Sequence, residues 1–98
     1  MTVPDAAPYC LIVDDEPRLR QVMVHLMRSD GFKCIEAGNG IEALEQLANF
    51  QVTLVLSDLR MPKMDGFELL REIRDRYPDS AVVMITAVAD VEIAVNCL

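Results

Sequence analysis

Short apolar runs alternate with amphipathic stretches four times along this chain, and this alternation constrains its fold more than any other feature. Continuous apolar runs such as residues 10–13 and 52–57 are typical of strands that are covered on both faces. The stretches between them repeat apolar residues every three or four positions, which is the spacing of a helix with one buried face. Strands that alternate with helices predict an α/β fold, a doubly wound parallel sheet joined by right-handed crossovers.

Turn and cap residues set the boundaries of the predicted elements. We expect strands at residues 10–13, 32–37, 52–57 and 81–86. Pro17 suits the first turn of the first helix and Gly31 its end, and Asp65 can cap the third helix. The stripes predicted to face the sheet are Leu19, Val22, Met23 and Leu26, then Ile41, Leu44, Leu47 and Ala48, then Phe67, Leu70, Ile73 and Tyr77, and in a fourth helix Val91, Ala94, Val95 and Leu98.

Size and charge exclude several classes of protein. The chain has 98 residues, enough for one domain, which we place at residues 9–98 after an extended lead-in at residues 1–8. Its net charge of −7 argues against a direct nucleic-acid partner or a membrane surface, because both require clustered Lys and Arg. No apolar run reaches the roughly 20 residues of a membrane span. Three cysteines without a CxxC pair indicate reduced thiols, and we expect a cytoplasmic protein.

Acidic residues follow two of the predicted strands. Asp14 and Asp15 come directly after the first strand, and Asp58 closes the third. Ligands of open parallel sheets bind at the carboxyl ends of the strands, so these acids meet at one edge if the two strands are neighbours. Carboxylates crowded together need a counter-charge, and oxygen ligands without Cys or His favour Mg²⁺. Asp14 and Asp15 could instead favour a helix N-terminus, whereas Asp58 has no local capping duty.

Three segments resemble the receiver domain of bacterial two-component response regulators: LIVDDE at residues 11–16, SDLRMPKMDG at 57–66 and MITA at 84–87. The resemblance implies a flavodoxin-like sheet with Asp58 as the acceptor of a phosphoryl group from a sensor histidine kinase or phosphotransfer protein. It implies Mg²⁺, with Mn²⁺ as a substitute, held by Asp15, Asp58 and the backbone carbonyl of Arg60, and by Asp14 through water.

The resemblance also assigns roles around the phosphoryl group. The hydroxyl of Thr86 would hydrogen-bond that group and act as a switch, and the small Ala87 would leave room for the donor imidazole. The domain would assist its own phosphorylation and dephosphorylation and would switch an absent output region, without being a conventional enzyme. His25, on the first helix, is expected to be a surface residue and not a phosphodonor.

The family's fifth strand and helix, with the lysine that binds the phosphoryl group, have no counterpart after Leu98. We therefore expect a sheet of order 2-1-3-4 and a truncated receiver. Its fourth strand and helix would be exposed and would favour self-association or a homodimer.

The missing lysine leaves open a second function, a receiver-like interaction module that is never phosphorylated. A haloacid-dehalogenase-type hydrolase also uses an aspartyl nucleophile, but the segment after Asp58 lacks the second Asp of that class. Dinucleotide binding is excluded because no GxGxxG follows the first strand.

Overall fold

The computed structural model of the protein describes residues 7–85, in which strands and helices alternate as predicted. The fourth predicted helix and residues 1–6 of the predicted lead-in at residues 1–8 lie outside the described residues. The elements are β1 (Tyr9–Val13), α1 (Pro17–Ser29), β2 (Lys33–Ala37), α2 (Gly40–Asn49), β3 (Val52–Asp58), α3 (Gly66–Arg76) and β4 (Ala81–Ile85).

The four strands form one parallel sheet of order β2-β1-β3-β4. This confirms the predicted flavodoxin-like order. At the carboxyl edge Val13 pairs with Ala37 on one side and with Ser57 on the other. The residues that follow β1 and β3 therefore leave the sheet side by side.

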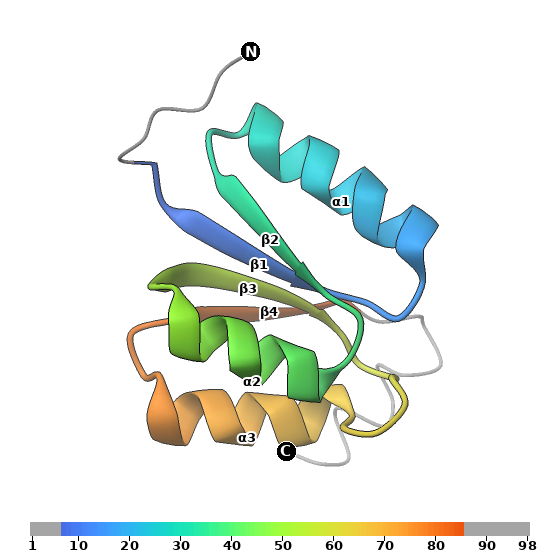
Figure 1. Cartoon of the computed structure of the whole chain (residues 1–98), viewed down its shortest axis with the longest axis vertical. Coiled ribbons are helices and arrows are strands. Elements are labelled where there is room, and N and C mark those ends of the chain that lie inside the picture. Colours follow the sequence, from blue (N-terminus) through green and yellow to red (C-terminus); the bar gives the residue numbers. More distant parts are fainter. Residues whose placement is uncertain (1–6, 86–98) are drawn as a thin grey trace.

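The helices cover the two faces of the sheet unequally. In Figure 1, α1 lies on one face, and α2 and α3 lie together on the other. β1 runs through the middle, and its residues Cys10 to Val13 are completely buried.

The core has two parts. One, toward α2 and α3, is built on Leu11, Val13, Ala37, Ala43, Leu47, Val52, Val55, Leu69 and Ile73. The other, toward α1, is built on Cys10, Ile12, Met23 and Val24.

Local signals in the sequence fix the helix ends. Pro17 occupies the first turn of α1, where a missing N–H costs no hydrogen bond. α1 ends at Ser29, and Gly31 then adopts a φ of 93°, a conformation that glycine accepts without strain. The side chain of Asp65 accepts a hydrogen bond from the backbone N–H of Glu68 at 2.9 Å, which confirms the predicted cap of α3.

The predicted inner face of α1 is wrong in part. Met23 is buried as expected, but Leu19, Val22 and Leu26 are 42%, 55% and 57% exposed, and Val24 is buried instead. The helix is turned so that Met23 and Val24, with Met27, rest on the sheet. Both stripes fit the helical period, and the contact with the sheet selects one of them.

Smaller corrections apply to α2 and α3. In α2, Ala43 and Leu47 are buried, whereas Ile41 and Ala48 of the predicted stripe are exposed. In α3 the buried side chains are Leu69 and Ile73, and the other residues of the predicted stripe, Phe67, Leu70 and Tyr77, are half-buried.

Cys10 and Cys34 carry free thiols on neighbouring strands. Burial, together with the nearby Cys34, raises the pKa of the Cys10 thiol to about 12, so that it is a neutral core residue at physiological pH. Among residues 7–85, no helix has the length and apolar character needed to cross a bilayer.

Candidate metal and phosphoryl site

Asp14 leaves the end of β1 in a tightly fixed conformation. Its backbone N–H donates a hydrogen bond to the carbonyl of Ala37 at 3.1 Å, which extends the pairing of β1 with β2 by one residue. Its Oδ1 accepts a hydrogen bond from the backbone N–H of Glu16 at 2.9 Å. The residue is only 2% exposed although its side chain is a carboxyl group. A buried carboxylate held in this way indicates a site rather than a solvated loop.

Asp58 is the last residue of β3 and pairs with Ile85 of β4. Its side chain is half-buried, while the preceding Ser57 is fully buried. The hydroxyl of Ser57 donates to the carbonyl of Asp58 at 2.9 Å, and the N–H of Gly66 closes the following loop on the carbonyl of Leu59 at 2.8 Å. The end of the strand and the start of α3 are therefore joined by backbone contacts beside the carboxylate.

The acids from the two strands converge. One carboxylate oxygen from each of Asp14, Asp15 and Asp58 lies within 4.8 Å of the other two. Asp14 is buried, Asp58 is half-buried and Asp15 is exposed, so the group opens to solvent on one side. This is the edge of the sheet predicted from the sequence, because residues more than forty positions apart meet at the carboxyl ends of adjacent strands.

The electrostatics of Asp58 reflect this crowding. Partial burial is the largest influence raising the pKa of its carboxyl, and the negative charges of Asp14 and Asp15 act in the same direction. Hydrogen bonds from the backbone of Arg60 and Leu59 oppose the shift but do not cancel it. Ionised carboxylates in such a group are stabilised by a hard cation, and an all-oxygen donor set fits Mg²⁺.

The competing explanation for these acids, helix capping, finds little support in the geometry. The N-cap of α1 is Glu16, and its side chain makes no capping hydrogen bond. Asp14 accepts from Glu16 in the turn before the helix, which leaves its second carboxylate oxygen outside that contact. Asp65 is the acid of this region that does cap a helix.

The structure describes some of the remaining residues for which the sequence predicts a role. Arg60 is exposed in the loop after Asp58, and His25 is exposed on α1, as predicted. Thr86 and Ala87 lie outside the described residues, and their roles remain predictions.

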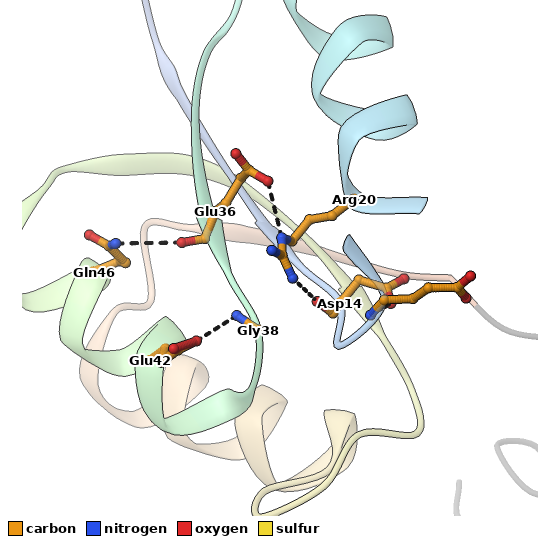
Figure 2. A network of polar contacts seen from close by, with 7 residues as sticks. Asp14, Arg20, Glu36, Gly38, Glu42 and Gln46 are labelled. Atoms are coloured by element: carbon orange, nitrogen blue, oxygen red, sulfur yellow. Dashed lines mark hydrogen bonds and ion pairs between the residues drawn. The ribbon is translucent and has the colours of Figure 1, made fainter. Parts of the chain in front are cut away.

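Sequence reasoning missed Arg20. This residue, on the first turns of α1, contacts both the end of β1 and β2 (Figure 2). The sequence signal for Arg20 was a positively charged residue on the helix that directly follows an acidic segment. The pattern gives no means of telling it from a solvated arginine.

The family model described as the response regulator receiver domain matches residues 10–98. The transcriptional regulator NtrC of Escherichia coli is 40% identical over 85 residues, which are 87% of this chain and 18% of NtrC. The regulatory protein AtoC of the same organism is 41% identical over 88 residues, 90% of this chain and 19% of AtoC. The chain thus spans about a fifth of the length of these curated relatives.

Solved structures with the same fold are also receiver proteins. A response regulator receiver protein from Pseudomonas putida has a TM-score of 0.82 at 29% identity, and the match covers 96% of this chain and 79% of that one. The response regulator TrrA from Thermotoga maritima, crystallised in complex with Mg²⁺ and BeF, has a TM-score of 0.79 at 32% identity, and the match covers 85% and 72% of the two chains.

Proposed function

Because this chain belongs to the family of response regulator receiver domains, we propose that it accepts a phosphoryl group on Asp58 in a Mg²⁺-dependent reaction. Receiver domains act in phosphorelay signalling and interact with sensor histidine kinases or phosphotransfer proteins. The single observation that carries the proposal is the convergence of the Asp14, Asp15 and Asp58 carboxylates within 4.8 Å.

The metal-binding residues in this proposal are Asp15, Asp58 and the backbone carbonyl of Arg60, with Asp14 acting through water. When bound, Mg²⁺ supplies positive charge that neutralises the oxygens of the transferred phosphoryl group. The choice of ion is supported by the oxygen-only donor set and by the Mg²⁺ complex of TrrA, which shares the fold. Mn²⁺ is expected to substitute, because it also accepts carboxylate ligands.

The carboxylate of Asp58 acts as the nucleophile. One of its oxygens attacks the phosphorus of a phosphohistidine, the P–N bond breaks, and the imidazole of the donor leaves with the electron pair. The product is an acyl phosphate on Asp58, which water later hydrolyses. Burial and the negative charges of Asp14 and Asp15 raise the pKa of Asp58, and a bound cation would offset this repulsion and favour the ionised nucleophile.

Two further roles complete the proposal. The Thr86 hydroxyl donates a hydrogen bond to the bound phosphoryl group and transmits its presence to the following loop, and the small Ala87 admits the donor imidazole. The domain is then a phosphoacceptor whose modification switches an output region, and it assists its own chemistry without acting as a turnover enzyme.

Intact-mass measurement after incubation with acetyl phosphate and Mg²⁺ tests this proposal. We expect one phosphoryl adduct on the wild-type chain, and none after Asp58→Asn or when Mg²⁺ is replaced by a chelator. Asp79→Asn is the matched control, because Asp79 is an exposed acid in the turn before β4, at the opposite edge of the sheet, and its adduct should equal that of the wild type. No adduct at saturating donor would contradict the proposal and favour the unphosphorylated interaction module.

A further inference from the structure

We propose that Arg20 is a positioning residue that holds Asp14 in place for the acidic site, an inference that rests on the proposed function. Arg20 has no role in the chemistry described above. Its guanidinium makes two contacts at once: Nε donates to Oε1 of Glu36 at 3.0 Å, and a terminal nitrogen donates to the backbone carbonyl of Asp14 at 2.8 Å. One side chain of α1 therefore ties the end of β1 to β2 (Figure 2).

The contact with Arg20 completes the restraint of Asp14. Its N–H donates to Ala37 at 3.1 Å, its carbonyl accepts from Arg20, and its Oδ1 accepts from Glu16 at 2.9 Å. Both backbone polar groups and one carboxylate oxygen are thus engaged. The direction of the Asp14 carboxylate is thus set before any ligand arrives.

The partner of Arg20 is itself held in place. Glu36 lies on β2, and its backbone carbonyl accepts a hydrogen bond from Nε2 of Gln46 at 3.4 Å. Two residues on, the N–H of Gly38 donates to the carboxylate of Glu42 at 2.7 Å. Both Gln46 and Glu42 belong to α2, so the anchor for Arg20 is fixed from the far side of β2.

The burial of the Arg20 side chain distinguishes this contact from an ordinary surface ion pair. The side chain of Arg20 is 20% exposed and that of Glu36 is 44% exposed. The ion pair of Arg76 with Glu72 on α3 has the same Nε-to-carboxylate geometry at 3.1 Å, but the side chain of Arg76 is 60% exposed, while that of Glu72 is 38% exposed, much like Glu36. The planar guanidinium suits a bridge between two acceptors, whereas an ammonium group has no fixed fork.

Outer residues that orient a metal ligand typically change metal affinity by 10–100-fold when they are removed. We expect Arg20→Met, which keeps the aliphatic stem, to weaken Mg²⁺ binding about 10-fold in a calorimetric titration. Amide hydrogen exchange of Glu16 should also become faster, because its acceptor on Asp14 is no longer held. Arg76→Met is the matched control and should leave both measurements unchanged.

Wild-type Mg²⁺ affinity together with wild-type exchange at Glu16 in Arg20→Met would overturn the inference. So would an equal loss of affinity in Arg76→Met, which would indicate general destabilisation. If Arg20→Met does not fold, Arg20→Lys is the deciding variant. Lysine keeps the positive charge but can replace only one of the two contacts, so we expect its Mg²⁺ affinity to be lower than that of the wild type. Wild-type Mg²⁺ affinity in Arg20→Lys would contradict the role of the bridge from Arg20 to Glu36 and Asp14. If the wild-type chain binds no Mg²⁺, the proposed function fails, while the exchange at Glu16 still reports whether Arg20 holds Asp14.

Discussion

At the scale of single residues, burial and the neighbouring carboxylates of Asp14 and Asp15 disfavour the ionised form of Asp58. A carboxyl group whose pKa is raised on folding stabilises the fold only below its ordinary pKa of about 4, and this contribution is lost as the pH rises through the raised value. At neutral pH without a cation, the ionised Asp58 therefore destabilises the folded state. Binding of a divalent cation would relieve this cost where the reaction is proposed to occur.

Because the ionised Asp58 destabilises the metal-free fold, we expect Asp58→Asn to stabilise it. In a chelator at neutral pH, the variant should have a higher free energy of unfolding than the wild type, by up to ~1 kcal/mol because solvent screens a half-exposed group. Urea denaturation measures the difference, which should vanish well below the ordinary carboxyl pKa, where Asp58 is protonated in both states. A difference that persists in acid, or a destabilised variant at neutral pH, would show that the crowding of carboxylates is not its cause.

At the scale of elements, the start of α3 packs directly on the end of β3. A Cβ added to Gly66 would lie 2.7 Å from the carbonyl oxygen of Asp58 and 2.9 Å from the Cα of Leu59, and it would also meet the side chain of Met84. Two of these neighbours are backbone atoms, one of Asp58 at the end of β3 and one of Leu59 directly after it. Glycine at this position therefore allows the close approach that sets the loop after Asp58.

Gly66→Ala should lower the free energy of unfolding by ~1–3 kcal/mol, the usual range for overpacking against atoms that cannot move aside. It should also reduce phosphoryl acceptance, because Asp58 is displaced. Gly38→Ala is a control for stability alone: its added Cβ meets the carboxylate of Glu42 at 3.1 Å, and because that flexible side chain can give way, the loss in free energy of unfolding should be smaller. Equal losses in the two variants, measured by urea denaturation, would contradict a specific role for the contact at Gly66.

Element boundaries could be predicted because local chemistry sets them. Pro17, Gly31 and Asp65 act through their own backbone or cap geometry, and each does in the structure what its type implies. The face that a helix buries is different, because adjacent stripes of α1 are both apolar and only the sheet selects between them. Leu19, Val22 and Leu26 were misplaced for this reason.

At the scale of the whole molecule, the alternation of strands and helices predicts a parallel sheet, and the resemblance to receiver domains implies its strand order. The acidic edge could be predicted from the positions of Asp14, Asp15 and Asp58, on the condition that their strands are neighbours. The bridge made by Arg20 could not. It depends on how α1 lies against β2, and nothing in the spacing of charges along the chain encodes that orientation.

The sheet also presents an edge. Among residues 7–85, β4 pairs only with β3, and its Val83 is 48% exposed. An apolar edge strand is a template for pairing with another chain, so we expect concentration-dependent self-association. Val83→Lys should reduce it, with stability changed by no more than ~0.5 kcal/mol.

Size-exclusion chromatography with light scattering measures this effect. Val22→Lys is the control, because Val22 is also an exposed apolar residue but lies on α1, and this variant should self-associate like the wild type. A wild-type chain that is monomeric at all concentrations, or association abolished by Val22→Lys instead, would contradict pairing through β4.

The most direct test of the central claim is to locate the phosphoryl group. Borohydride reduces an aspartyl phosphate to homoserine, so treatment with acetyl phosphate and Mg²⁺, then borohydride, then peptide mass mapping identifies the acceptor. We predict homoserine at position 58 and at no other aspartate, with the yield dependent on Mg²⁺. Modification of Asp14 or Asp15 instead, or equal modification without a divalent ion, would contradict the account.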